Sequence, residues 1–258
     1  MLLILKLTLV PMLVVLVTLA TRRWGPRIGG LLAGLPIVTG PALFFFAIEQ
    51  GNAFAAEASR AVIVSLIGVA ASALTYAWAA TRAPWWLSLP ISWTSFLVTV
   101  LVVQRTRVTP TPALAAALAS IVLAQVLLPR SGSQTVGQRP IWDLPLRMIA
   151  SMALIISVTA LAERLGPTLS GALTPFPAAM SILLGFSHAQ HGSSAAINFL
   201  RGFMPGMWSF TAFCFVLSVS IVAVGTAMGF VLALASTVPI QAAVLWWMRR
   251  GPTARRLL

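Results

Sequence analysis

The chain has 258 residues, of which 59% are hydrophobic and 8% are charged, and its 4 acidic residues leave a net charge of +13. An ordinary soluble domain is about a quarter charged, so this composition excludes a soluble protein and predicts an all-α integral membrane protein. An outer-membrane barrel is excluded as well, because its short segments of alternating hydrophobicity are missing.

Apolar runs long enough to cross a bilayer recur along the chain and predict about nine transmembrane helices in one membrane domain, residues 1–258. The first run could be a signal peptide, but no small-residue cleavage pattern follows it, so we expect it to be a span. In chain order the predicted helices cover residues 3–21, 28–49, 60–81, 86–104, 112–129, 144–162, 170–190, 203–224 and 226–248.

The second and seventh of these runs contain residues that weaken helices. Their motifs are "RWGPRIGGLLAGLPIV" at 23–38 and "RLGPTLSGALTPFPAA" at 164–179, and a shift of 141 positions relates them without a gap. Residues in register include Arg23 with Arg164, Gly25 with Gly166, Pro36 with Pro177, Gly51 with Gly192 and Arg60 with Arg201. The pattern predicts a duplication: repeat unit 1 at 1–104, a linking helix and loop at 105–143, and repeat unit 2 at 144–258.

Each unit holds four predicted helices and one helix links them, so the second unit should enter the membrane from the opposite side, as an inverted repeat. Most arginines then fall on one side of the membrane, which predicts an inner-membrane protein of a bacterium with its N-terminus outside and its C-terminus in the cytoplasm. If 28–49 and 170–190 were re-entrant hairpins, the repeats would be parallel, and the excess of arginines on one side of the membrane would be as large as in the inverted arrangement. Spanning helices are the simpler alternative, because each segment is just long enough to cross.

The glycines and prolines predict interrupted helices at 28–49 and 170–190. Irregular backbone survives in lipid only where protein or a water-filled cavity covers it, and paired breaks in two halves of a chain indicate a transporter's central site. We expect a shared polar cavity there, with substrate-binding residues Gly34, Pro36, Thr39, Gly40, Thr174, Pro177 and Ser181. The alternative is that the small residues serve helix packing alone.

Four further residues are candidates for ion coupling or for binding charge. Glu49 lies at the end of a predicted span, and His188 could carry a coupling proton. Arg60 and Arg201 open the helices after the broken ones and could bind an anionic group. A simpler alternative exists for each residue. Glu49 could be a solvated charge at a helix end, and His188 an interfacial histidine that is hydrogen-bonded to a neighbouring helix. Arg60 and Arg201 could anchor their helices at the headgroups.

We find no nucleotide-binding, zinc-helix or hydrolase motif, so we expect no enzyme, no cofactor and no metal site. The arginines lie in short loops as topology signals, so nucleic acid is not an expected partner. The first hypothesis is a gradient-driven secondary transporter of a small organic solute. The alternatives are a flippase or carrier for a lipid or polyprenyl phosphate, and a non-transporting scaffold subunit. The expected partners are the bilayer and the small-molecule or lipid substrate, and a homo-oligomer is possible.

The motif "RxGPxxxGxLxxxP", followed by "TGPALFFFAIEQG" at 39–51, resembles a family of small multi-span inner-membrane proteins of bacteria with an internal repeat. This resemblance covers most of the chain and implies no particular substrate. More distantly, the arrangement is similar to inverted-repeat carriers with broken helices, such as the bile-acid-symporter-like and cation-antiporter-like groups. Those groups have more spans, and the antiporters carry paired core acidic residues that this sequence lacks.

Overall fold

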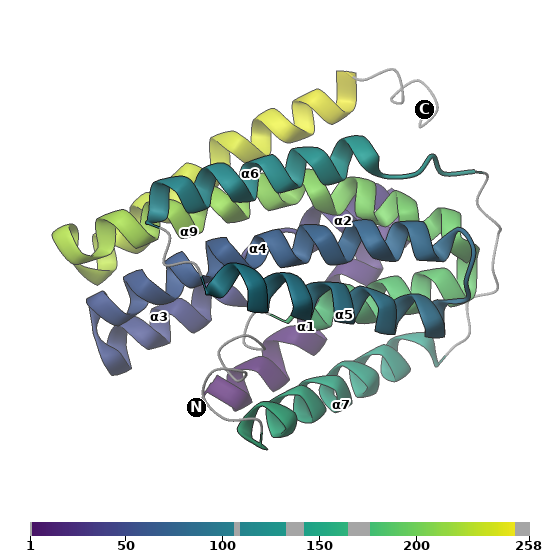
Figure 1. Ribbon diagram of the computed structural model, residues 1–258, viewed down its shortest axis with the longest axis horizontal. Helices are drawn as coiled ribbons and strands as arrows, with labels where there is room; N and C mark the ends of the chain where they lie inside the picture. The colour runs from purple at the N-terminus through teal and green to yellow at the C-terminus, as the bar shows by residue number, and fades with distance from the viewer. Residues whose placement is uncertain (1, 106–108, 133–141, 165–175, 251–258) are drawn as a thin grey trace.

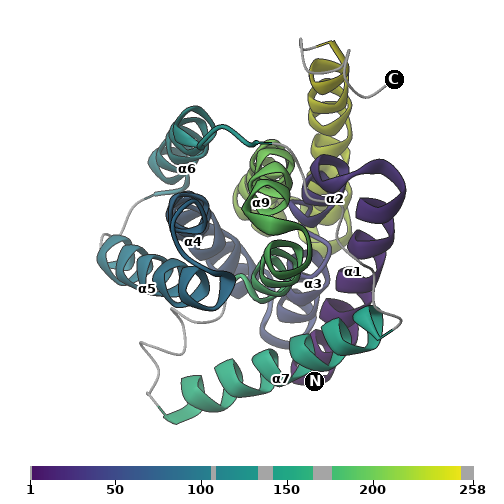
Figure 2. The same ribbon diagram turned by 90° about the vertical axis from the view of Figure 1, so that its right-hand side faces the viewer.

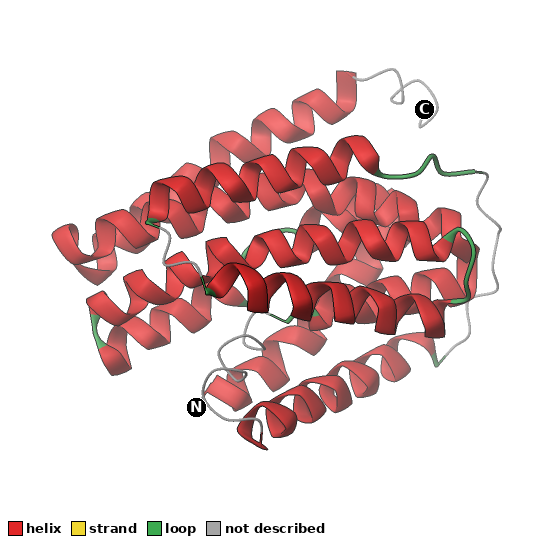
Figure 3. Ribbon diagram, in the orientation of Figure 1, coloured by secondary structure: helices red, strands yellow, loops and turns green. Residues whose placement is uncertain are grey.

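A computed structural model describes residues 2–105, 109–132, 142–164 and 176–250 of the chain, and these residues form helices joined by short turns, without a strand (Figures 1 and 3). The expected all-helical class is therefore confirmed. In chain order the helices are α1 (Leu2–Trp24), α2 (Pro26–Ala33), α3 (Thr39–Gln50), α4 (Asn52–Ala80), α5 (Trp85–Gln104), α6 (Pro110–Leu127), α7 (Asp143–Arg164) and α9 (Ala178–Arg250).

Within the described residues, five helices are long and apolar enough to cross a membrane by length and composition, as is typical of a membrane protein. The qualifying segments are Leu7–Trp24, Asn52–Ala80, Trp85–Val103, Pro110–Leu127 and Ala178–Met248. The last of these is not one continuous helix. Its backbone leaves the helical conformation at Gly192 (φ 78°, ψ 175°) and at Gly225 (φ 83°, ψ 169°), so α9 consists of three helical pieces.

Two predicted helix starts differ from the structure. The helices expected to begin at 60 and 203 begin earlier, because α4 starts at Asn52 and helical backbone resumes directly after Gly192. Arg60 and Arg201 were expected to open these helices but lie inside them. A helix accommodates these charges because Arg60 pairs with Glu57 one turn earlier, and Arg201 donates hydrogen bonds to backbone carbonyls of another segment.

The helices pack around the first two pieces of α9. Figure 2 shows these pieces at the centre, with α4, α5 and α6 on one side and α1 and α2 on the other, while α7 lies on the outside. A buried apolar core joins α1, α4, α5 and α9, and its largest fully buried side chains include Tyr76, Phe96 and Phe199. A second cluster, around Leu43 and Phe213, packs α3 against α4 and α9.

Four glycines bring α2 and α9 into direct backbone contact. A Cβ atom added to Gly30 would lie 1.9 Å from the carbonyl oxygen of Phe199, and one added to Gly206 would lie 2.5 Å from that of Leu31. Gly34 and Gly202 approach the opposite backbone in the same way. Small residues four apart let two membrane helices approach closely, so helix packing accounts for these glycines.

The segment 28–49 is interrupted, as the sequence predicts. The helix α2 ends at Ala33, and α3 begins at Thr39 after a short irregular segment that contains Pro36. We call residues 34–38 the first break. In the other predicted interrupted helix, residues 170–175, including Thr174, lie outside the described residues, and α9 begins at Ala178 directly after Pro177.

Candidate functional site

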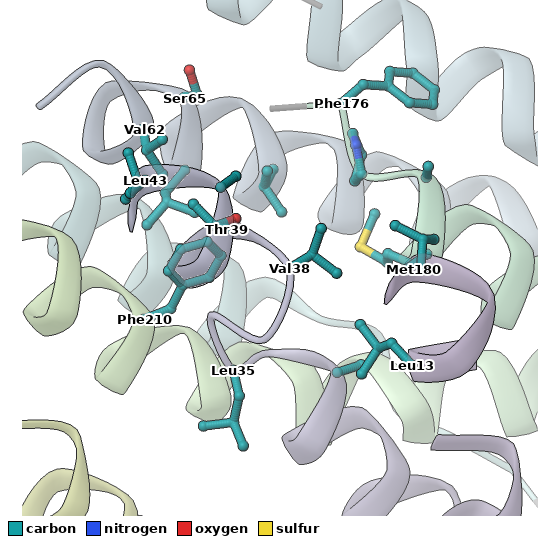
Figure 4. A pocket seen from close by; sticks show the side chains of 18 of the residues that line it. Leu13, Leu35, Val38, Thr39, Leu43, Val62, Ser65, Phe176, Met180 and Phe210 are labelled. Atoms are coloured by element: carbon teal, nitrogen blue, oxygen red, sulfur yellow. The ribbon is translucent and has the colours of Figure 1, made fainter. Parts of the chain in front are cut away.

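A cavity of about 360 Å³ lies between the first break and the residues that lead into α9. On one side it is lined by Leu35, Val38 and Thr39, and on the other by Phe176, Pro177 and Met180. Side chains of α1, α3, α4, α7 and the second piece of α9 complete its wall, among them Leu13, Val62 and Phe210. Figure 4 shows these side chains around the space, with Val38 at the centre pointing toward Met180. We call this the apolar cavity.

The lining of this cavity is apolar, whereas the sequence predicted a polar one. Among the described lining residues, Thr39 and Ser65 have the only polar side chains, and the Ser65 hydroxyl donates to the carbonyl of Ala61. The peptide groups around the break bond to each other. Leu35 N–H donates to Leu32 O (3.2 Å), Ile37 N–H to Leu35 O (2.9 Å) and Gly40 N–H to Pro36 O (2.8 Å), so part of the backbone of the break is satisfied locally.

Of the predicted substrate-binding residues that the structure describes, only two line this cavity. These two are Thr39 and Pro177. Gly34 packs on Gly206, and Gly40 faces the ring of Phe213. Pro36 lies in the first break, and Thr174 is outside the described residues.

Ser181 ties α5 to the start of α9 behind the cavity wall. Its Oγ accepts a 2.9 Å hydrogen bond from Trp93 Nε1 and donates one of 2.9 Å to the carbonyl of Pro177. The Trp93 ring also meets Phe176 edge to face, with 5.7 Å between centroids. Ser181 therefore holds Pro177 and Phe176 in position from outside the cavity.

The candidates for coupling or charge binding do not line the apolar cavity. Glu49 is exposed at the end of α3, and Arg60 pairs with Glu57. His188 Nδ1 lies 3.2 Å from the buried hydroxyl of Tyr76. Arg201 Nη2 donates to the carbonyls of Leu128 (3.3 Å) and Pro129 (2.9 Å), at the end of α6.

A second cavity, of about 230 Å³, contains a charged network that the sequence did not predict. The Asp143 carboxylate accepts hydrogen bonds from Arg22 Nη2 (2.6 Å), Arg147 Nε (2.7 Å) and Gln190 Nε2 (2.6 Å). Arg147 Nη2 also donates to Gln190 Oε1 at 3.0 Å. We call this the polar cavity. Its walls come from α1, α2, α7 and α9.

The environment of Asp143 keeps it ionised at neutral pH. Burial raises the pKa of this carboxyl group, but hydrogen bonds from Gln190, Arg147 and Arg22 lower it by more, so the pKa lies below its usual value. The guanidinium of Arg147 lies over the ring of Phe186, with 4.8 Å to the ring centroid, which adds a cation–π contact. The network therefore contains two cations and one anion.

One signal in the sequence could have revealed this network. Asp143 and Arg147 are four residues apart, the spacing at which an acidic and a basic side chain meet on one helix face. Asp143 was expected to be the last residue of the linking helix and loop at 105–143. Its other partners, Arg22 and Gln190, come from distant segments that no local pattern connects to it.

The two cavities follow one another along the same helices. On the first two pieces of α9, Met180 and Phe203 line the apolar cavity, and Leu183 and Phe199, about one turn away, line the polar cavity. On α1, the corresponding residues are Leu13 and Thr18. One α-helical turn advances about 5.4 Å, so on these helices the lining residues of the two cavities lie only one to two turns apart.

Comparisons with protein-family models, curated proteins and solved structures return no match to this chain. The function is therefore inferred from the two cavities and the residues that build them.

Proposed function

We propose that this chain is a gradient-driven transporter of a small organic solute that binds in the apolar cavity. The observation that carries the proposal is the position of this cavity, between the first break at Val38 and the chain entering α9 at Phe176 and Pro177. Irregular backbone at membrane depth is tolerated where it lines a cavity, and transporters bind substrate at such broken helices.

The lining of the cavity limits what can bind there. A volume of about 360 Å³ is at the lower end of the range for small-molecule sites. A solute held mainly by Leu35, Val38 and Phe210 gains affinity from buried apolar area, so its larger part must be apolar. A strongly hydrated sugar or amino acid fits this lining poorly, because its polar groups would lose their hydrogen bonds to water.

The proposal includes an inverted duplication, in which the two units rock around the cavity. Two observations support it. Gly51 and Gly192, which are 141 positions apart, have φ 89° and ψ 167° at the first and φ 78° and ψ 175° at the second, a conformation that Gly25 and Gly225 also adopt. The helices α1 and α7, which the same shift relates, lie side by side, and Arg22 near the end of one pairs with Asp143 at the start of the other, as in an antiparallel pair.

The proposed setting is the inner membrane of a bacterium, with the C-terminus in the cytoplasm, because most arginines then lie on the cytoplasmic side. A carrier of a lipid or polyprenyl phosphate is the second candidate, and the apolar lining of the cavity favours it. Neither Arg60 nor Arg201, the two arginines expected to bind an anionic group, lines the apolar or the polar cavity.

Solute flux into proteoliposomes tests the proposal. The panel contains apolar, amphipathic and polar solutes, each measured under imposed proton and sodium gradients. Val38→Trp fills the centre of the cavity and is expected to reduce flux at least tenfold. Val126→Trp is the matched control, because Val126 on α6 is 75% exposed, and it is expected to leave flux within about twofold of the unmodified protein.

Saturable flux that Val38→Trp abolishes supports the transporter. Unchanged flux in Val38→Trp refutes the site, and absence of flux for every solute and gradient refutes the transporter. Movement of labelled lipid between leaflets, blocked by the same variant, would instead favour the lipid carrier.

A further inference from the structure

Within the described residues, the polar cavity carries a positive charge that its one carboxylate does not balance. Arg22 and Arg147 both bond to Asp143, so two guanidiniums face one carboxylate. The exposed fractions of the side chains are 29% for Arg22, 6% for Arg147 and 3% for Asp143, so water solvates the surplus charge only in part. A buried charge without a partner is costly, and an anion in the cavity would remove that cost.

Donor groups remain available for such an anion. A guanidinium has five N–H donors. Arg22 uses one of its donors on Asp143, and Arg147 uses two, on Asp143 and Gln190. The Asp143 carboxylate already accepts three hydrogen bonds and has about one acceptor site left, so it can take only one of the remaining donors.

The amino-terminal end of α2 also borders this cavity. Gly25 and Pro26 line it, and the eight-residue helix that begins at Pro26 has no side-chain cap. Pro26 has no N–H group, so the free donors at this end belong to the residues after it, and the carbonyl end of α1 at Thr21 and Arg22 lines the same cavity with an opposite partial charge. The positive charge of the cavity therefore comes from the arginine side chains.

We infer that the polar cavity binds the anionic oxygen group, a carboxylate or a phosphate, of an amphipathic solute whose apolar part occupies the apolar cavity. The inference rests on the proposed function and names the class of its substrate. It assigns the binding of the anionic group to Arg22 and Arg147.

On α9, two aromatic side chains lie where the cavities approach each other. Phe199 borders the polar cavity and Phe203 the apolar one, and their rings stack with 6.4 Å between centroids. Because side chains rotate more readily than backbone moves, a bound solute can pass beside these rings and reach both cavities. A chain of a few methylene groups is long enough to cross one helical turn of about 5.4 Å.

Equilibrium binding to the full chain in phosphatidylcholine nanodiscs tests this inference. Radiolabelled octanoate and octyl phosphate are the amphipathic anions. Octanol provides the same tail without charge, and acetate and inorganic phosphate provide the charge without the tail. Empty nanodiscs measure the partition of each probe into lipid. We expect both amphipathic anions to bind at least tenfold more tightly than octanol, acetate or inorganic phosphate.

Variants identify the groups that bind. Arg22→Gln is expected to weaken octanoate binding about tenfold, since a charge-assisted hydrogen bond is lost, while Arg22→Lys keeps the charge and most of the affinity. Arg23→Gln is the matched control, because it removes an exposed arginine from the next position of α1. Val38→Trp is expected to weaken octanoate binding to the level of acetate and to leave acetate binding unchanged.

Three results would overturn the inference. Octanol could bind as tightly as octanoate, or Arg22→Gln and Arg23→Gln could lose the same amount of octanoate affinity. Acetate could also bind as tightly as octanoate, which would show a site for free anions only. Binding and flux separate this inference from the transporter proposal. Specific octanoate binding without flux refutes the transporter and leaves the site, whereas saturable flux of uncharged solutes without anion binding refutes the site and leaves the transporter.

Discussion

The carboxylate of Asp143, the first residue of α7, accepts a 2.6 Å hydrogen bond from the guanidinium of Arg22, which lies 121 positions earlier in the last turn of α1. Arg147, one turn further along α7, bonds to the same carboxylate. One buried acidic group therefore joins two helices that are far apart in the sequence, and its removal leaves two arginines facing each other.

Asp143→Asn is expected to destabilise the protein by about 3 to 5 kcal/mol, because removal of one partner of a buried ion pair leaves uncompensated charge. Thermal unfolding in detergent measures the change. Glu57→Gln removes the carboxylate of the exposed pair with Arg60 and is expected to cost less than about 1 kcal/mol. Equal losses in the two variants would contradict the buried role of Asp143.

The stability of the protein is expected to fall in acid because of the same carboxyl group. The pKa of Asp143 is lower in the folded protein than its usual value of about 4, so its contribution is complete above that pH and is lost as the pH falls through the folded pKa. Melting temperatures measured from pH 7 downward should therefore drop more steeply below about pH 4 in the unmodified protein than in Asp143→Asn. Parallel curves would show that other groups control the acid response.

Gly202→Ala is expected to prevent the close contact between α2 and α9. The new Cβ atom would lie 1.8 Å from the carbonyl oxygen of Arg27, so the backbones must separate at a cost of about 1 to 3 kcal/mol or more. Gly40→Ala is the control, because its Cβ atom would make an ordinary 3.6 Å contact with the Phe213 ring. The melting temperature should fall in the first variant alone, and a fall of the same size in both would argue against backbone contact as the cause.

Gly51→Ala and Gly192→Ala are expected to destabilise the protein by similar amounts, each about 1 to 3 kcal/mol, because both positions adopt backbone angles that are nearly restricted to glycine. No atom lies within 4 Å of a Cβ atom added at Gly51, so backbone strain and not a clash causes the loss there. Chemical unfolding in detergent measures both effects. A neutral result at Gly51 would show that the turn can adopt another conformation.

Pro36→Ala is expected to reduce solute flux more than it reduces stability. The alanine supplies an N–H group that can extend α2 toward α3, which would straighten the first break and move Val38 out of the cavity. Pro90→Ala, inside the exposed face of α5, is the control and should change flux little. Greater loss of flux in Pro90→Ala than in Pro36→Ala would contradict the role of the break.

Composition and the length of the apolar runs were sufficient to predict an all-helical chain with membrane-spanning segments. Exposure of apolar side chains to water is costly at every position of such a run, whatever the tertiary structure. The first break was also predictable, since proline at 36 and glycine at 34 act on their own backbone. The predicted helix starts at 60 and 203 were wrong, because an arginine next to an apolar run was taken to mark the end of a membrane helix. A partner such as Glu57 removes that restriction, and pairing depends on the folded helix.

The character of the site was less predictable than its position. The expected cavity beside Thr39 and Pro177 is present, but it is apolar, since the peptide groups of the break bond locally. The charged network at Asp143 was missed because its four members come from three helices that meet only in the tertiary structure. Local sequence patterns describe neighbours along the chain, and this network depends on neighbours in space.

The glycine contact between α2 and α9 separates the frame of the site from its chemistry. The wall beside the first break is held by main-chain atoms of Arg27, Leu31 and Phe199, whereas the side chains of Val38 and Phe210 face the apolar cavity without taking part in that contact. Substitution of either side chain changes the size of the apolar cavity and leaves the backbone contact between α2 and α9 in place. Through such exchanges, descendants of this chain can diversify in what they hold while they keep one architecture.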